Sequence, residues 1–96
     1  METIKLLIGD RDADASKNAT FNRLNPVTGD VATKASAASV EDARAAADAA
    51  AAAFPKWAAL GPNERRNRLL KAADLLESKA QQFATLGLAE MGATLG

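Results

Sequence analysis

Residues 24–30 read Leu24-Asn25-Pro26-Val27-Thr28-Gly29-Asp30. Proline disfavours the helical region for the residue before it, and its own φ is already set for a turn. Gly29 can adopt a left-handed backbone at little cost. The run therefore predicts a turn between a strand at 20–24 and a strand at 31–35. Taken alone, it is an ordinary proline-glycine turn.

The first residues predict one more strand. Ile4, Leu6 and Ile8 alternate with other residues, which is typical of a strand with one better-buried face, and Gly9 ends the pattern. Residues 10–19 are rich in Asp, Ala, Ser and Asn without periodicity, which predicts a loop. The simplest arrangement is an open hairpin between the strands at 4–8 and 20–24.

From residue 37 onward the pattern becomes helical. Ser39 is a suitable N-cap, and Asp42 places a carboxylate at the positive end of the helix dipole. Pro55 predicts that this first helix ends at residue 54. Its apolar face carries small residues that let a neighbouring backbone come close: Val40, Ala43, Ala47, Ala50 and Phe54.

Two further helices follow. Pro62 is well placed in the first turn of the second helix, and Glu64 precedes Arg68 in the favourable order for a surface ion pair. Ser78 and Gln81 form a capping pair for a third helix, and Gly92 is its predicted C-cap. The apolar stripes are Leu69, Ala72, Ala73 and Leu76 on the second helix, and Ala80, Phe83, Ala84, Gly87, Leu88 and Met91 on the third.

The composition limits the chemistry. Among 96 residues there is no cysteine and no histidine, so a disulfide, a thiolate nucleophile and an imidazole base are all excluded from this sequence. Twelve basic residues balance twelve acidic ones, which argues against nucleic acid as a partner. The basic cluster at 65–71 is flanked by Glu64, Asp74 and Glu77 and is interpreted as a solvated helix face. The start of the chain fits neither a signal peptide nor a membrane span, so a cytoplasmic location is expected.

Three weak strands followed by three helices predict an α+β chain, with a strand segment at 1–36 and a helical part at 37–96. Its apolar faces outnumber the partners that so short a chain supplies internally. Trp57, just after the first helix, is expected to anchor a core or an interface. The missing partner is expected to be more protein.

In this order, the motifs resemble the amino-terminal region of the NAD(P)-dependent aldehyde dehydrogenases. The likeness spans nearly the whole chain and is carried by Ile8-Gly9, Phe21 to Leu24, Asn25-Pro26-Val27-Thr28-Gly29-Asp30, the helix at 40–54, Trp57, Glu64-Arg65, Leu69-Leu70, Ala73-Asp74 and Leu76-Glu77. The segment Glu90-Met91-Gly92-Ala93-Thr94 resembles the branch that acts on aromatic aldehydes such as salicylaldehyde, vanillin or benzaldehyde. Two departures stand out: the first strand is followed by Gly9-Asp10-Arg11-Asp12 where the family often has Asn-Gly-Glu-Trp, and Arg23 stands where an apolar residue is usual.

The resemblance implies an α+β segment of an α/β enzyme, in which short strands and three helices flank a Rossmann-type coenzyme domain. It implies oxidation of an aldehyde to a carboxylic acid by a cysteine thiolate, an oxyanion hole, a glutamate-activated water and NAD or NADP. Those groups lie beyond residue 96 in the family, so no catalytic or cofactor-binding residue is assigned to this chain. The remainder of the dehydrogenase chain is the implied partner, and the full-length protein is expected to be a homo-oligomer.

The resemblance also implies a monovalent cation site within the segment. The family frequently binds such an ion through a backbone carbonyl just before Asn-Pro and through an acidic residue near the third helix, which correspond here to Leu24 and Glu90. Hard cations prefer oxygen ligands of this kind. The alternative interpretation is that Glu90 is a solvated carboxylate at a helix end.

Two functional hypotheses therefore remain open. The first is a fragment or truncated product of an aldehyde dehydrogenase, a scaffold that is inactive alone. The second is a complete small helical module that binds another protein. In the second case the partner would bury Val40, Phe54, Leu69, Leu76, Phe83 and Met91.

Overall fold

The computed structural model describes residues 2–93 of the chain. The predicted role of Thr94 in the aromatic-aldehyde motif therefore falls outside the described residues. Five strands precede three helices: β1 Thr3–Ile4, β2 Leu6–Ile8, β3 Arg11–Ala13, β4 Thr20–Leu24, β5 Val31–Ser36, α1 Val40–Ala59, α2 Pro62–Ser78 and α3 Ala80–Met91, with a short 3-10 turn at Ser16–Asn18. This order confirms the predicted succession of strands and then helices.

The predicted turn at 24–30 is confirmed. It joins β4 to β5 as an antiparallel hairpin in which Phe21 lies opposite Ala35. The Asn25 N–H donates to the Asp30 carbonyl at 2.7 Å, and the Gly29 N–H donates to the Asn25 carbonyl at 2.8 Å. Gly29 adopts φ 80°, which is the left-handed backbone that glycine permits most easily.

The predicted hairpin between 4–8 and 20–24 is wrong. The first stretch is divided at Lys5: β1 runs parallel to β5, with Thr3 opposite Lys34, whereas β2 pairs antiparallel with β3. Residues 10–19 are not a plain loop, because they contain β3 and the 3-10 turn. Gly9, at φ 67°, begins the two-residue connection from β2 to β3, and positive φ suits so tight a hairpin.

Helix α1 runs past the predicted stop at Pro55 and ends at Ala59. A proline inside a helix removes one N–H donor, here the one that would reach the Ala51 carbonyl, yet the residues after it keep their own donors. The helix ends instead where Leu60 becomes extended and its N–H donates to the Trp57 carbonyl at 3.1 Å. Pro62 then opens α2, as predicted.

The caps of α3 agree with the sequence at one end only. The predicted Ser78 and Gln81 cap is wrong: Lys79 is the N-cap and makes no side-chain capping bond. The Ser78 hydroxyl donates to the Leu75 carbonyl at 2.6 Å, so it is already used within α2. Gly92 is the C-cap at φ 71°, and its N–H donates to the Leu88 carbonyl at 3.1 Å, which confirms that prediction.

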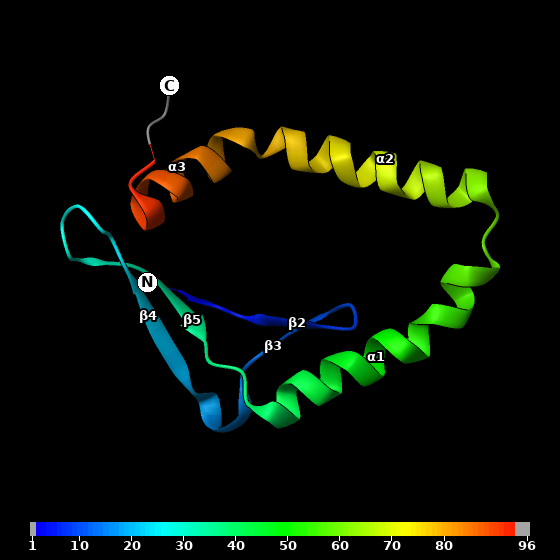
Figure 1. Ribbon diagram of the computed structural model, residues 1–96, viewed down its shortest axis with the longest axis horizontal. Coiled ribbons are helices and arrows are strands. Elements are labelled where there is room, and N and C mark those ends of the chain that lie inside the picture. The colour runs from blue at the N-terminus through cyan, green and yellow to red at the C-terminus, as the bar shows by residue number, and fades with distance from the viewer. Residues whose placement is uncertain (1, 94–96) are drawn as a thin grey trace.

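The chain is an open frame with little core of its own. In Figure 1, α1, α2 and α3 run around an opening that the β4–β5 hairpin completes, and β2 lies beside α1. The radius of gyration is 16.9 Å, against about 13 Å for a compact domain of 100 residues. Ala15 is the buried apolar residue of the described part, at 4% exposure. Large apolar side chains are exposed on all three helices, including Val40, Phe54, Leu69, Leu76, Phe83 and Met91.

Candidate functional site

Two polar clusters hold the frame together at its corners, and they are the built sites of the described residues. The first cluster joins the 3-10 turn to the start of α1. The second joins the end of α3 to the β4–β5 hairpin. They are defined below as the Asp42 cluster and the Glu90 cluster.

The Asp42 cluster consists of Ser16, Ser39 and Asp42. The Asp42 N–H donates to the Ser39 hydroxyl at 3.1 Å, and the Ser39 N–H donates to Asp42 Oδ2 at 2.9 Å, which confirms the predicted cap of α1. Ser16 adds two further bonds to the same carboxylate, from its N–H to Oδ2 at 3.0 Å and from its hydroxyl to Oδ1 at 2.7 Å. A helix cap is thereby extended to a segment that lies far earlier in the chain.

These donors control the charge of Asp42. The backbone N–H of Ser39, then the backbone N–H of Ser16 and its hydroxyl, lower the pKa of Asp42 from 3.8 to about 2, because each donor favours the ionised carboxylate. Nothing in the sequence around Ser16 points to this role, since its partner is brought close only by the fold. The cluster therefore connects the 3-10 turn to the start of α1 through one shared carboxylate.

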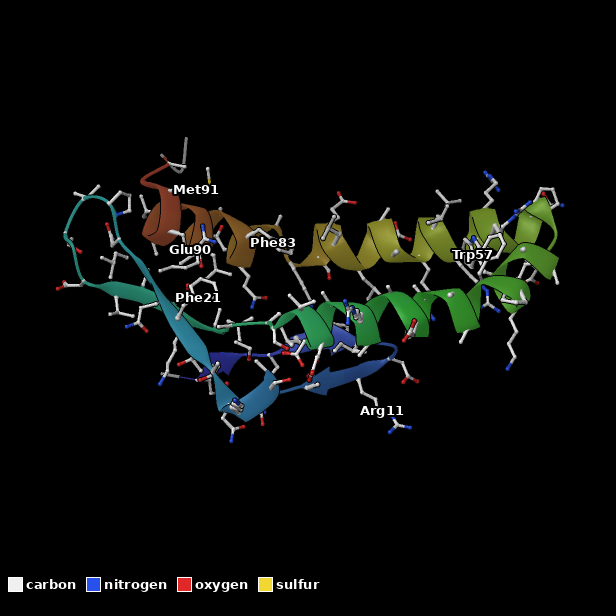
Figure 2. All side chains as sticks on the ribbon, turned by 60° about the horizontal axis from the view of Figure 1, so that its bottom comes forward. Arg11, Phe21, Trp57, Phe83, Glu90 and Met91 are labelled. Atoms are coloured by element: carbon white, nitrogen blue, oxygen red, sulfur yellow. The ribbon has the colours of Figure 1, made fainter. Side chains whose placement is uncertain are left out.

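The Glu90 cluster consists of Arg23, Thr33 and Glu90. The Thr33 hydroxyl donates to Glu90 Oε1 at 2.7 Å, and Arg23 Nε lies 3.8 Å from Glu90 Oε2. Arg23 and Thr33 are opposite each other across β4 and β5, so one cross-strand pair receives the carboxylate. Glu90 points from α3 toward this hairpin (Figure 2), and its side chain is 26% exposed.

The end of α3 also packs on the turn at 24–30. A Cβ atom placed on Gly92 would lie 3.4 Å from Pro26 Cγ and 3.5 Å from Val27 Cγ2, which are ordinary contact distances and show how close the end of α3 lies to the turn. Asn25 stabilises this turn, because its side-chain oxygen accepts a hydrogen bond from the Val27 N–H at 2.8 Å. The end of α3 therefore packs against the turn at residues 24–30.

The residues predicted to bind a cation, Leu24 and Glu90, belong to the elements that meet at this cluster. Leu24 is the last residue of β4 and pairs with Val31, directly after Arg23. Both oxygens of Glu90 already face donors, one a hydroxyl and the other a guanidinium. Among the described residues there is no group of three or more acidic side chains that would hold a metal. Glu90 lies at a helix end, as the alternative interpretation had it, but its side chain is 26% exposed and bonded to the hairpin. The cation site at Leu24 and Glu90 stays a prediction.

The remaining exposed features are not sites. The Arg68 Nε and Glu64 Oε2 lie 3.9 Å apart, as the spacing predicted, with both side chains more than 60% exposed. Such a pair contributes little to stability. Trp57 lies at the corner where α1 turns into α2 and is 39% exposed (Figure 2). Within residues 2–93, none of the helices is both long and apolar enough to cross a membrane.

An open recess lies between the β2–β3 hairpin and a face of α1 that differs from the predicted apolar face. Ala50 belongs to both faces, whereas Val40 and Phe54 of the predicted face are 69% and 62% exposed. The lining of the recess is mostly apolar and consists of Leu7, Gly9, Asp10, Ala46, Ala49, Ala50 and Ala53. Asp10 is the one charged residue there, and it lies beside Arg11 at 3.8 Å. The recess has no set of converging polar groups that would orient a small molecule.

The chain resembles known proteins over nearly its whole length. Residues 13–96 match the model of the aldehyde dehydrogenase family. A vanillin dehydrogenase from Pseudomonas sp. (strain HR199 / DSM 7063) is 54% identical over 90 residues, which are 94% of this chain and 18% of that protein. A salicylaldehyde dehydrogenase from Pseudomonas putida is 47% identical over 90 residues, which are 94% of this chain and 19% of that protein.

Two solved structures superpose on nearly the whole chain. The salicylaldehyde dehydrogenase from Pseudomonas putida G7, complexed with salicylaldehyde, superposes with a TM-score of 0.94 at 42% identity, over 99% of this chain and 20% of that one. PnpE in complex with nicotinamide adenine dinucleotide superposes with a TM-score of 0.89 at 36% identity, over 96% of this chain and 19% of that one. The predicted fold, short strands followed by three helices in the arrangement of an aldehyde dehydrogenase, is confirmed by these superpositions.

The chain spans about a fifth of the length of the relatives that it matches. Short strands followed by three helices, with the turn at 24–30 between two of the strands, are the arrangement that the resemblance implied. From the match over residues 13–96 and the shared structure it follows that this chain belongs to the aldehyde dehydrogenase family.

Proposed function

We propose that this chain is the amino-terminal part of an enzyme that oxidises an aromatic aldehyde to the corresponding carboxylic acid. The observation that carries the proposal is the superposition, at a TM-score of 0.94, on a fifth of a dehydrogenase that is complexed with salicylaldehyde. The identity of 54% to a vanillin dehydrogenase supports the aromatic class of substrate. NAD or NADP, bound by the complete enzyme, would accept the hydride.

Within that enzyme the chain acts as a scaffold. It contains no cysteine for attack on an aldehyde and no histidine to take up a proton. Its two built polar clusters connect elements of the frame: the Ser16 and Thr33 hydroxyls each donate to a carboxylate, and Arg23 forms an ion pair with Glu90. We therefore assign positioning to these residues and no catalytic role to the chain.

The exposed apolar faces give the scaffold its function. Leu69 and Leu76 on α2 are 62% and 59% exposed, and Phe83 on α3 is 52% exposed. Full burial of one such side chain contributes about 1.5 to 3 kcal/mol, so several of them provide a strong drive to bind another surface. The remainder of the dehydrogenase chain is the proposed partner, because the relatives extend over about five times this length.

The proposal extends to the organisation of the protein. The strand segment at 1–36 and the helical part at 37–96 are proposed as two pieces of one coenzyme-binding domain, divided between the end of β5 and the start of α1. The complete enzyme is proposed to be a cytoplasmic homo-oligomer. The competing function is a stand-alone module that binds a separate protein. In that case the complete protein would not oxidise an aldehyde.

An activity assay separates the two. The complete protein that carries this chain and the 96-residue chain alone are each mixed with NAD+ or NADP+ and with salicylaldehyde, vanillin or benzaldehyde, and reduction of the coenzyme is followed by absorbance. We expect reduction by the complete protein and none by the isolated chain. Coenzyme reduction by the pure chain, or none by the complete protein with any aldehyde, contradicts the proposal.

A further inference from the structure

The Glu90 cluster carries an inference about how its charge is balanced. The Glu90 carboxylate is about three-quarters covered, and it meets β4 and β5 from the last turn of α3. A carboxylate that loses part of its hydration must be compensated by hydrogen bonds and by positive charge. Thr33 supplies a hydrogen bond at 2.7 Å but no charge.

Arg23 is the positive group that the fold brings there. Its Nε lies 3.8 Å from Glu90 Oε2, and this is the ion pair that the structure gives Glu90 among residues 2–93. The register of β4 and β5 shifts between Arg23 and Leu24, so that Arg23 pairs with Thr33 and Leu24 with Val31. Irregularities of this kind change the direction of the neighbouring side chain, and here Arg23 is directed at the end of α3.

We propose that Arg23 supplies the positive charge at Glu90 that a monovalent cation would otherwise supply. A small cation needs several oxygen ligands with free lone pairs. One Glu90 oxygen instead faces the hydroxyl hydrogen of Thr33, and the other faces a guanidinium, which repels a second cation at short range. The structural stability of this protein is therefore independent of potassium and sodium, although its sequence carries the pair Leu24 and Glu90.

The test is the melting of the complete protein in three salts, and it rests on the proposal that this chain is part of a longer enzyme. Apparent melting temperatures are measured at one scan rate in KCl, NaCl and tetramethylammonium chloride at equal concentration. Equal concentration makes the screening of the ion pair the same in all three, so that a difference reports binding of a small cation. Because melting does not depend on turnover, the result stands whether or not the protein oxidises an aldehyde.

The expected results distinguish a charge from a bound ion. The unaltered protein and Arg23→Lys melt at the same temperature in all three salts. Arg23→Met melts lower in tetramethylammonium chloride and recovers by about 2 °C or more in KCl or NaCl, because a small cation then replaces the lost charge. Arg11→Met is the matched control, since Arg11 Nε also lies 3.8 Å from a carboxylate, that of Asp10, but both side chains are nearly fully exposed. It melts like the unaltered protein in each salt.

Two outcomes overturn the proposal. One is a melting temperature of the unaltered protein that rises in KCl or NaCl and no longer does so in Glu90→Gln, which means that a cation binds beside Arg23. The other is an Arg23→Met protein that melts like the unaltered one in all three salts. If Arg23→Met does not fold, the comparison of the unaltered protein with Glu90→Gln still decides between the two sources of charge.

Discussion

At the scale of single residues, the structure depends on two residues that each belong to a helix end and also meet a second segment. Asp42 completes the capping box of α1 and also accepts two hydrogen bonds from Ser16. Gly92 ends α3 with a left-handed backbone and lies next to Pro26. In both cases a local capping rule, readable in the sequence, coincides with a distant contact that the sequence does not reveal.

Asp42 makes the stability depend on acid pH. Its pKa is about 2 in the folded chain and 3.8 in the ordinary state, so its contribution is present above about pH 4 and is lost as the pH falls toward about 2. We expect the denaturation midpoint of the complete protein to fall more steeply below about pH 4 than that of Asp42→Asn. Asp48→Asn, on the same helix but without a side-chain bond among the described residues, serves as control and should follow the unaltered protein. If the denaturation midpoints of Asp42→Asn and of the unaltered protein fell equally steeply below about pH 4, this role would be refuted.

Gly92 should not tolerate a side chain. Its φ of 71° strains any residue that has a side chain, and this strain carries the prediction because a Cβ atom would lie at an ordinary contact distance of 3.4 Å from Pro26 Cγ. Gly92→Ala is expected to lower the free energy of unfolding by about 1 to 2 kcal/mol, measured by chemical denaturation. Gly87→Ala is the matched control, because Gly87 is inside α3 with nothing within 4 Å of its Cβ position, and alanine favours helix there. Equal effects of the two substitutions would contradict the strain argument.

At the scale of elements, local rules predicted those parts whose signals are themselves local. The turn at 24–30, the Ser39 cap, the proline start of α2 and the glycine end of α3 each need only a few adjacent residues. The strand β3 was missed because Arg11–Ala13 has no apolar alternation and forms only by pairing with β2. The division of the first strand at Lys5 was missed because its two halves pair with different strands.

The candidate site shows the same division. Glu90 was singled out by a family motif, and its surroundings came only from the fold, which places Arg23 and Thr33 opposite each other and α3 above them. The departure at Arg23 was visible in the sequence as an unusual residue. Its consequence was not, because a register shift in β4 and β5 determines where its side chain points.

Pro55 provides a test of the longer α1. If the helix continues to Ala59, Pro55 lies in its interior and costs one hydrogen bond and a clash with the preceding turn. Pro55→Ala should then stabilise the protein by about 2 kcal/mol, since the interior penalty of about 3 is partly offset by a more flexible unfolded chain. The midpoint of urea denaturation measures this. An unchanged midpoint is the result expected if the helix ended at residue 54.

At the scale of the whole molecule, the described part of the chain is an open arrangement of strands and helices with almost no hydrophobic core. Its extents are 49 × 38 × 16 Å, and its large apolar side chains are mostly exposed (Figure 1). A single buried apolar residue in the described part, Ala15, cannot offset the entropy of ordering so many residues. The excess of apolar faces was predicted from the sequence by counting stripes against possible partners, and the open frame confirms that excess.

Amide hydrogen exchange tests this account most directly. The complete protein and the 96-residue chain are compared under the same conditions, with peptides covering α2 at 62–78 as the readout. We expect strong protection of α2 in the complete protein and rapid exchange in the isolated chain, because the proposed partner, the remainder of the enzyme, would cover the exposed Leu69 and Leu76. Equal protection of α2 in both samples would show that the chain folds independently of any such partner and would contradict the account.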